Sequence, residues 1–348
     1  MNRGSVPIVW LVFAALLAGV GAIVVLAGIV GLVRIAGGAG GATDRASAGV
    51  AVPPSSAASV PPDGTGSPRA TAAASGASTP LPAEVVLVGA GDIGRCDATT
   101  DDDTAALVET LPGIVFTLGD NAYEHGTEGE YRDCFGPSWG RFKDRIQLPV
   151  PGNHEYETRG AEGYRSYFGD RAVRDGRTWY SQEVGAWHVI VLDSTCDGVE
   201  GGCDADSPQV RWLRDDLAAS RAPCTLALFH HPRFSSGQHG SDRHVGPFWD
   251  ALYDGGADLV LNGHDHDYER FAPQDPEGRR DDERGLMELV AGTGGAALRA
   301  FRDPVANSRV RAAVAHGVVE LRLSQTGWRW QFHSTDRSFT DAGSGRCH

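Results

Sequence analysis

Lysine is almost absent from this 348-residue chain, and positive charge is scarce throughout. Lys143 is the only lysine, and 31 Lys and Arg residues stand against 45 Asp and Glu residues. From residue 84 onward there are 27 basic and 43 acidic residues, a net charge of −16. Sequence-independent binding of nucleic acid needs a basic surface that neutralises phosphates. The composition therefore argues against a protein that binds to a nucleic-acid scaffold.

The first 83 residues lack lysine and glutamate altogether, and Val6–Val33 carry no charged or strongly polar side chain. This apolar stretch has 28 residues. About 20 apolar residues are enough to cross a bilayer, whereas a cleaved signal peptide has an apolar core of only about 7–15. We therefore predict that residues 1–35 hold a signal anchor, a transmembrane helix that makes this a single-pass protein of the cell membrane. A long cleaved signal, which would leave a secreted protein, is the alternative.

Residues 36–83 have few of the large apolar side chains from which a hydrophobic core is built. Gly, Ala, Ser, Thr and Pro make up 40 of these 48 residues, a composition typical of a disordered linker. The remaining 265 residues, 84–348, are enough for one large domain. No similar stretch interrupts them, so we expect a single folded domain there.

No CxxC pair occurs in the chain, so a structural zinc site is poorly supported. The six cysteines all lie beyond the predicted anchor: Cys96, Cys134, Cys196, Cys203, Cys224 and Cys347. An even number of cysteines beyond a membrane segment indicates disulfide bonds in an oxidising compartment. Cys196 and Cys203 bracket a short Asp/Gly loop and are the one pair that we predict; the other pairings stay open. Residues 84–348 are therefore expected outside the cytoplasm, and six reduced cysteines in a cytosolic protein are the alternative.

Short apolar runs alternate with amphipathic stretches from residue 84 onward. Eight runs predict β-strands: Glu84–Val88, Ile114–Leu118, Trp187–Leu192, Thr225–Phe229, Asp258–Leu261, Leu286–Ala291, Val318–Leu323 and Trp328–Phe332. Three stretches predict helices: Asp103–Thr110, Gln209–Ser220 and Val245–Tyr253. Asp103 or Thr104 is expected to cap the first helix, and Ser207-Pro208 to open the second. Early strand–helix alternation followed by closely spaced strands indicates a layered α/β body.

Polar residues follow five of the apolar runs, where open α/β sheets place their binding sites. The five blocks are Gly91-Asp92-Ile93-Gly94, Gly119-Asp120-Asn121-Ala122-Tyr123, Gly152-Asn153-His154-Glu155, His230-His231-Pro232 and Gly263-His264-Asp265-His266. Asp, Asn, Tyr and His side chains together suit an O/N-ligated di-metal centre of iron, zinc or manganese. Each block alone is a weak signal. Five of them in order, each after an apolar run, predict one metal site.

Other polar runs receive plainer interpretations. Asp101-Asp102-Asp103 lacks the spacing of an EF-hand and is expected to be a solvated helix start. Gly292-Thr293-Gly294-Gly295 lacks the Gly-Lys-Ser/Thr ending of a P-loop and is expected to form a tight turn near the rim of the site. Four further side chains are candidates to support or line the site: His125, His231, Arg233 and His244.

The ordered motifs GDIG, GDNAY, GNHE, HHP and GHDH resemble those of the calcineurin-like metallophosphoesterases, and among these the purple acid phosphatases. Tyr123 is the discriminating residue, because most other metallophosphoesterases lack this metal-ligating tyrosine. The run from Gly263 to Arg270 is also similar to the purple acid phosphatase version. The resemblance covers residues 84 to 335 and implies an α/β fold of four layers, an αββα sandwich that forms the catalytic domain.

Carried over by position, the resemblance implies two sets of metal ligands. The first metal would be bound by Asp92, Asp120, Tyr123 and His266. The second would be bound by Asp120, Asn153, His230 and His264, so that Asp120 bridges the two ions. In the family the first metal is Fe(3+) and the second is Fe(2+), Zn(2+) or Mn(2+). The resemblance also implies that His154 contacts the phosphate and that His239 protonates the leaving alcohol.

Two neighbouring ions of this kind can hold a hydroxide and clamp the phosphoryl oxygens of an in-line displacement. They also explain how an acidic domain accepts an anion, because the local charge at the centre is positive. We therefore predict a phosphomonoesterase of the acid phosphatase type that hydrolyses small phosphate esters with a metal-bound hydroxide as nucleophile. A phosphodiesterase or nucleotidase on the same site is one alternative. A non-catalytic cell-surface binding protein is another. The natural substrate, the second metal and the oligomeric state are left open.

Overall fold

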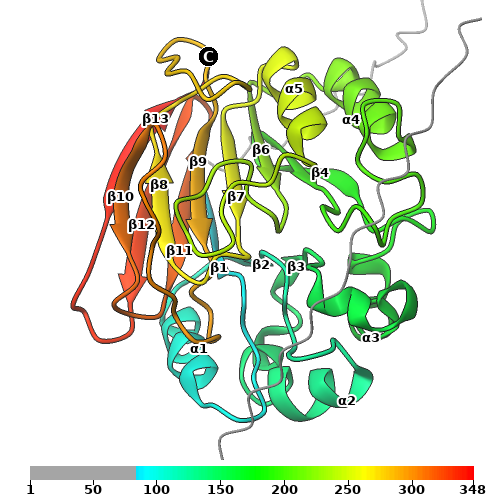
Figure 1. Cartoon of the computed structure of the whole chain (residues 1–348), viewed down its shortest axis with the longest axis vertical. Helices are drawn as coiled ribbons and strands as arrows, with labels where there is room; N and C mark the ends of the chain where they lie inside the picture. Colours follow the sequence, from blue (N-terminus) through cyan, green and yellow to red (C-terminus); the bar gives the residue numbers. More distant parts are fainter. Residues whose placement is uncertain (1–83) are drawn as a thin grey trace, which may run out of the picture. The chain divides into compact units, whose positions relative to one another are not determined.

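The computed structural model describes residues 84–348 of the chain, and the predicted anchor and linker lie outside the described residues. In the described part, no helix is both long and apolar enough to cross a membrane. This part contains thirteen strands (Figure 1). Their bounds are β1 Glu84–Ala90, β2 Ile114–Thr117, β3 Ile146–Leu148, β4 Tyr180–Val184, β5 Trp187–Val191, β6 Cys224–Leu228, β7 Leu259–Asn262, β8 Tyr268–Phe271, β9 Met287–Ala291, β10 Ser308–Ala312, β11 Gly317–Ser324, β12 Gly327–Ser334 and β13 Ala342–Arg346.

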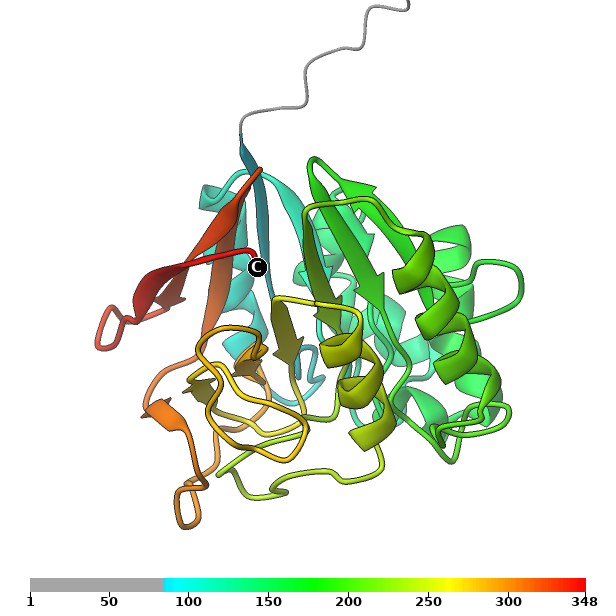
Figure 2. The same cartoon turned by 90° about the horizontal axis from the view of Figure 1, so that it is seen from above.

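The strands form two sheets with parallel centres. One sheet has the order β13-β12-β11-β1-β2-β3, and the other has the order β10-β8-β9-β7-β6-β5-β4. In the first sheet β1, β2 and β3 run parallel, and in the second sheet β5, β6, β7 and β9 do so. Figure 2 shows β1 beside β11, its antiparallel partner from the far end of the chain. The parallel strands bring their carboxyl ends to one edge of each sheet.

Helices lie on the outer faces of the sheets. The longer ones are α1 Thr100–Thr110, α3 Glu162–Phe168, α4 Pro208–Ala219 and α5 Gly246–Asp254, with α2 reduced to Glu128–Glu130. Single helical turns occur at Tyr131–Phe135, Trp139–Phe142, His154–Glu157, Arg159–Ala161 and Gly169–Arg171. Figure 1 shows α4 and α5 on the side of the body opposite to α1, α2 and α3.

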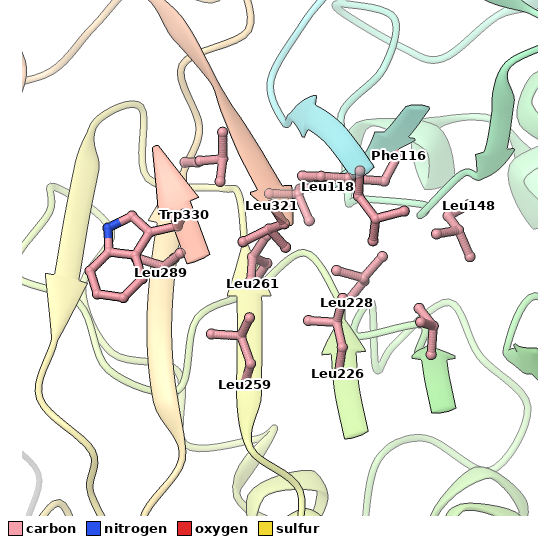
Figure 3. Packing of buried hydrophobic residues seen from close by; sticks show 14 of the residues in the cluster. Phe116, Leu118, Leu148, Leu226, Leu228, Leu259, Leu261, Leu289, Leu321 and Trp330 are labelled. Carbon is pink, nitrogen blue, oxygen red and sulfur yellow. The ribbon is translucent and has the colours of Figure 1, made fainter. Parts of the chain in front are cut away.

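Strand residues alternate between an inner and an outer core, as the two-residue period of a strand requires. On β6, Leu226 and Leu228 point into the core between the sheets, while Ala227 packs outward beneath the helices. Leu259 and Leu261 of β7 join the same inner core, where Figure 3 shows them facing residues of the other sheet. Strands buried on both faces read as continuous apolar runs, which is why they were visible in the sequence.

Each outer core joins one sheet to its helices. Ala105 and Val108 of α1 pack against Val88 and Val115 of the first sheet. Leu213 of α4 and Trp249 of α5 belong to the outer core of the second sheet, together with Ala227 and Val260. The body is therefore an α/β sandwich with the layers helix, sheet, sheet and helix.

The eight predicted strands and three predicted helices are all present, with ends shifted by up to three residues. Strands β3, β4, β8, β10 and β13 were not predicted, because they are short or polar at every second position, as in the Ala-Gly-Ser-Gly-Arg run of β13. Ser207 caps α4 as predicted, since its hydroxyl accepts a hydrogen bond of 3.2 Å from the N–H of Val210. Neither proposed cap of α1 is correct, because this helix begins at Thr100.

The interpretation of Asp101 as a solvated residue is also wrong. Its side chain is buried, with 3% exposure, and accepts a hydrogen bond from the hydroxyl of Ser138. The carboxylate thus joins α1 to the loop that follows the helical turn at Tyr131–Phe135. The hydroxyl partner satisfies a carboxylate that burial would otherwise destabilise.

Three disulfides use all six cysteines. The predicted Cys196–Cys203 pair is confirmed. The pairings left open are Cys96–Cys134 and Cys224–Cys347. Cys224–Cys347 spans 123 residues and ties the end of the chain to the first residue of β6. A cross-link that closes so long a loop restricts the unfolded chain strongly.

Candidate metal centre

The five polar blocks all follow strand ends. Asp92 comes after β1, and Asp120 comes after its parallel neighbour β2. His230 comes after β6, and His264 comes after its parallel neighbour β7. Parallel neighbours end at the same edge of a sheet, and the two sheets pack face to face. The fold therefore brings residues that are distant in sequence to one place, as the sequence predicted.

The four proposed ligands of the first metal form a buried group around the hydroxyl of Tyr123. That oxygen lies 2.8 Å from Oδ1 of Asp92, 3.2 Å from Nε2 of His266 and 3.2 Å from Oδ2 of Asp120. Nε2 of His266 also lies 3.3 Å from Oδ1 of Asp92. All four side chains are at most 4% exposed. Oxygen and nitrogen donor atoms thus converge on one point.

The proposed ligands of the second metal converge in the same way around His230. Its Nε2 lies 3.1 Å from Oδ1 of Asn153, 3.2 Å from Nδ1 of His264 and 3.2 Å from Oδ2 of Asp120. The same carboxylate oxygen of Asp120 therefore belongs to both groups. The structure brings all seven predicted ligands together and places Asp120 between the two sets.

Hydrogen bonds from the backbone orient these ligands. Oδ2 of Asp92 accepts a hydrogen bond of 2.8 Å from the N–H of His264. Oδ1 of Asp120 accepts a hydrogen bond of 2.9 Å from the N–H of His154. Nδ1 of His230 donates to the carbonyl of Leu118 at 2.7 Å. That bond leaves Nε2 as the ring nitrogen that faces the centre and could bind a metal. Partners of this kind fix the tautomer and direction of metal-binding histidines.

The backbone itself is held in an unusual conformation at three of the proposed ligands. Asp92, Asp120 and His264 have φ values of +61°, +49° and +71°. Residues other than glycine rarely adopt this left-handed conformation, which costs about 1–3 kcal/mol for each residue. A β-carbon on Gly263 would come 2.7 Å from Oδ2 of Asp92, so the glycine before His264 is needed for this close approach. Such strain concentrates at functional sites.

Glu155, the last residue of the GNHE block, connects two of the ligand loops. Its buried carboxylate accepts hydrogen bonds from the N–H groups of Gly152, Asp120 and Asn121 at 2.7, 2.9 and 2.8 Å, and from the hydroxyl of Tyr131 at 3.0 Å. Burial and the charge of Asp120 raise the pKa of Glu155 to about 7, while the backbone donors oppose the rise. Glu155 fixes the loop of Asn153 against the loop of Asp120, a role that the sequence analysis missed although the motif contains the residue.

His154 and His239 lie beside the two ligand groups. Nδ1 of His154 contacts the carbonyl of Glu124, and its Nε2 lies 3.8 Å from Oδ2 of Asp120. The ring of His239 lies 4.3 Å from that of His264, between ring centres, and its Nε2 contacts the guanidinium of Arg299. Both rings reach the edge of the centre, but the convergent atoms of the two groups do not include theirs.

Two buried carboxylates hold the loop that carries His239. Asp265 accepts hydrogen bonds from the N–H groups of His239 at 2.7 Å and Gly240 at 3.2 Å. Glu269 accepts from the N–H of Ser236 at 2.7 Å and from its hydroxyl at 2.6 Å. Both acids come from the GHDHDYER run, so the run that supplies two histidines also positions a third. Only the tertiary structure shows these contacts.

The charges at the centre are strongly coupled. Burial alone would lower the pKa of His230, but Asp120 and Asp92 raise it to about 9. His230 and His154 in turn lower the pKa of Asp120 despite its burial. Burial and the same two carboxylates raise the pKa of the Tyr123 phenol. Cations bound among these groups would take over the role of the imidazolium proton, so metal binding should release protons.

A cavity of about 220 Å³ opens beside Asn153. Its lining residues are Asn153, Ser194, Thr195, Cys196, Asp197, His231, Asp242 and His244. The ring of His231 lies 4.4 Å from that of His264, and its Nδ1 lies 2.9 Å from the hydroxyl of Ser194. His231 and His244 are thus at the site as expected, whereas His125 and Arg233 do not line this cavity.

Sequence comparison decides the family. The calcineurin-like phosphoesterase family model matches residues 86–268, just over half of the chain. The chain belongs to this family. Among curated calcineurin-like relatives, purple acid phosphatase 15 of Arabidopsis thaliana is 29% identical over 225 residues, which cover 54% of this chain and 41% of the relative. Purple acid phosphatase 18 of the same plant is 26% identical over 279 residues, with coverages of 71% and 59%.

The solved structures agree on the fold of this calcineurin-like phosphoesterase. The purple acid phosphatase PPD1 from yellow lupin (Lupinus luteus) seeds superimposes with a TM-score of 0.61 at 19% identity, covering 76% of this chain and 54% of that one. The chain spans about half the length of the curated relatives it matches. Within the family it is purple-acid-phosphatase-like, as predicted.

The family implies a dinuclear metal centre, and the residues present fit one. Two groups of donor atoms share one carboxylate oxygen, and buried clusters of metal-binding side chains include Asp92, Asp120 and His230. Carboxylate, phenol, amide and imidazole donors without thiolate suit iron, zinc or manganese. The chemistry of the donor atoms therefore fits the dinuclear metal centre that the family implies.

Proposed function

We propose that this protein is a di-metal phosphomonoesterase of the acid phosphatase type. Asp92, Asp120, Tyr123 and His266 would hold the first ion, and Asp120, Asn153, His230 and His264 would hold the second. The observation that carries the proposal is the position of Asp120, whose Oδ2 lies 3.2 Å from both the Tyr123 hydroxyl and Nε2 of His230. A single carboxylate shared by two donor groups is the arrangement that a bridged pair of ions requires.

The identity of the metals is part of the proposal. We expect Fe(3+) in the first position, because a buried phenol beside two carboxylates offers the hard, anionic donors that a trivalent ion favours. Fe(2+), Zn(2+) or Mn(2+) would occupy the second position, where imidazole and amide donors predominate. Two ions bound there would draw charge from the phosphoryl oxygens and make a water molecule nucleophilic near or below neutral pH.

The chain's own side chains would complete the reaction. The oxygen of water forms a bond to phosphorus while the bond from phosphorus to the ester oxygen breaks. His154, held by the carbonyl of Glu124, would present Nε2 to a phosphoryl oxygen and stabilise the charge that develops on it. His239 would give a proton to the departing ester oxygen, so that the leaving group departs as a neutral alcohol. The donating form is the imidazolium, and Nδ1 is the ring nitrogen that does not contact Arg299.

The test compares a monoester with a diester on the purified full-length protein. p-Nitrophenyl phosphate should be hydrolysed with a higher kcat/KM than bis(p-nitrophenyl) phosphate, and a chelator should abolish the reaction until metal is restored. A higher kcat/KM on the diester would favour the phosphodiesterase alternative. Two bound metal ions without hydrolysis of either ester would favour the non-catalytic binding protein.

We further propose that the catalytic domain is held outside the cell by a single-pass membrane anchor, or is secreted if the N-terminal segment is cleaved. The apolar stretch Val6–Val33 supports an anchor, and three disulfides in the described residues support an oxidising compartment. Protease added to intact cells should release an active fragment by cutting within residues 36–83. Recovery of the whole chain from the cytosol would contradict this location.

A further inference from the structure

Arg299 brings a guanidinium group to the edge of the proposed metal centre. It lies on the loop that follows β9, and its backbone N–H donates to the carbonyl of His266 at 3.0 Å. Its Nη1 contacts Nε2 of His239. The residue is therefore fixed at its backbone against a proposed metal ligand and at its side chain against the proposed proton donor.

The positive charge of Arg299 is not neutralised by an acidic side chain in the described part of the chain. Some arginines of this acidic body are paired with carboxylates, such as Arg95 with Asp97 at 2.9 Å and Arg270 with Asp341 at 2.7 Å, and others are not. Arg299 forms no such pair among residues 84–348, and an imidazole is its one side-chain hydrogen-bond partner there. A guanidinium has five N–H donors in a planar fork that matches carboxylate and phosphate oxygens. Most of these donors remain available to a ligand.

The surroundings favour an anion next to Arg299 over one in the cavity beside Asn153. That cavity has the carboxylates of Asp197 and Asp242 in its wall, which would repel a negatively charged group. Arg299 touches His239, the residue proposed to face the leaving group. A negative charge carried by the leaving group would therefore find its favourable partner at Arg299.

We propose that Arg299 is a specificity residue that binds an oxyanion on the leaving-group side of the scissile phosphoryl. The favoured substrates would then be those whose leaving group carries a phosphate, as in a phosphoanhydride, or a carboxylate near the ester oxygen. This inference rests on the proposed phosphatase function. It adds a determinant of substrate class to the residues identified from the motifs.

The experiment compares wild type, Arg299→Gln and Arg302→Gln as full-length proteins loaded with metal. Arg302 is a matched control, because it lies three residues further on, is exposed, and makes no side-chain hydrogen bond or ion pair within residues 84–348. The substrates are inorganic pyrophosphate, 2-carboxyphenyl phosphate and phenyl phosphate, of which only the last has no second anionic group. A comparison of the first two substrates shows whether Arg299 recognises a phosphate or a carboxylate on the leaving group.

Arg299→Gln should lower kcat/KM for at least one of the two anionic substrates by about 10- to 100-fold, the effect of losing a charge-assisted hydrogen bond. The loss should appear mainly in KM, and kcat/KM for phenyl phosphate should fall by a clearly smaller factor, because this substrate has no second anionic group for Arg299 to bind. Arg299→Lys should recover part of the loss, and Arg302→Gln should resemble wild type. Equal losses on all three substrates, or none, would overturn the role of Arg299.

A binding measurement separates this inference from the proposed function. Calorimetric titration of the metal-loaded protein with pyrophosphate and with 2-carboxyphenyl phosphate should give a weaker affinity for Arg299→Gln than for wild type with the recognised anion. If wild type binds that anion through Arg299 but hydrolyses none of the three substrates, the proposed function fails and the oxyanion site stands. If wild type hydrolyses the substrates and Arg299→Gln binds both anions as tightly as wild type, the oxyanion site fails and the proposed function stands.

Discussion

The carboxylate of Asp265 accepts a hydrogen bond of 2.7 Å from the backbone N–H of His239. Asp265 lies between His264 and His266, which belong to the two ligand groups. One short run of chain therefore orients donors of both groups and also fixes the loop that carries the proposed proton donor. A change at Asp265 should disturb the position of His239 while the ligand side chains remain.

Asp265→Asn keeps the shape of the side chain but loses its charge and one acceptor oxygen. Charge-assisted hydrogen bonds of this kind contribute roughly 1.5–3 kcal/mol each, so the variant should be less stable. Its kcat on alkyl phosphates should fall by about tenfold, less than the roughly 10²–10⁴-fold expected when a general acid is removed altogether, with both metals retained.

Asp258→Asn is the matched control for this variant. Asp258 is another buried aspartate, and it accepts a hydrogen bond of 2.8 Å from the backbone N–H of Thr225. It lies just before β7, at the opposite end of that strand from His264. Thermal unfolding should show a loss of stability in both variants. A similar fall of kcat in both would show that Asp265 has no particular role in placing His239.

His154 and His239 should differ in how their loss depends on the leaving group. His239→Ala should cost about 10²–10⁴ in rate on alkyl esters, as expected for removal of a general acid, and much less on esters of acidic phenols. His154→Ala should cost a similar factor on both kinds of ester, because its proposed partner is the phosphoryl oxygen. Rates across a series of leaving-group pKa values, with metal content measured in parallel, give the comparison. A leaving-group dependence unchanged in His239→Ala would remove His239 from the donor role.

Tyr123→Phe tests the proposed ferric ion. A phenolate bound to Fe(3+) should give a broad visible charge-transfer band, and removal of the hydroxyl should abolish it. Tyr123 is 3% exposed and phenylalanine fills nearly the same volume, so the fold should persist. Absorption spectra and metal analysis of both proteins provide the measurement. A colourless, active wild type that contains only zinc or manganese would refute the ferric assignment and leave the phosphoesterase assignment intact.

His188 should make stability depend on pH at a place remote from the proposed ligands. Burial lowers the pKa of this histidine, but hydrogen bonds to Asp216 at 2.7 Å and Glu183 at 2.9 Å raise it above its ordinary value overall. A histidine in an unfolded chain has a pKa of about 6.5. The stabilisation by His188 is therefore fully present below that pH and is lost as the pH rises through the folded-state pKa.

Denaturant unfolding at pH 5.5 and pH 9 measures this effect. His188→Gln should lower the free energy of unfolding more at pH 5.5 than at pH 9. His125→Gln, a change at an exposed histidine whose side chain has no hydrogen bond in residues 84–348, should have the same small effect at both. An equal loss at the two pH values in His188→Gln would show that its charge does not stabilise the fold.

Local sequence signals were enough to predict that the five polar blocks meet at one metal site. Asp92, Asp120 and His264 each follow an apolar run that is buried on both faces, and neighbouring parallel strands must end together. The resemblance to a known family then gave each position its expected role. Strand β13 was missed because its Ala-Gly-Ser-Gly-Arg sequence carries no apolar period and forms only by pairing with β12.

Roles that depend on distant contacts were not accessible from the sequence. Arg299 lies 60 residues from His239 along the chain, and nothing near either residue indicates that they touch. Glu155 and Asp265 stand within recognised motifs, but their hydrogen-bond partners are backbone groups, which no side-chain pattern can reveal. Two of the three disulfides likewise join cysteines that lie 38 and 123 residues apart along the chain.

The most direct test of the central claim is the metal content and activity of Asp120→Asn beside wild type, with Asp258→Asn as the control for a buried aspartate. Wild type and Asp258→Asn should each contain two transition-metal ions per chain and hydrolyse p-nitrophenyl phosphate. Asp120→Asn should keep at most one ion and lose activity by at least about 10²-fold, because metal ions carry the nucleophile and the charge stabilisation. An Asp120→Asn protein with two ions and wild-type hydrolysis would contradict the account.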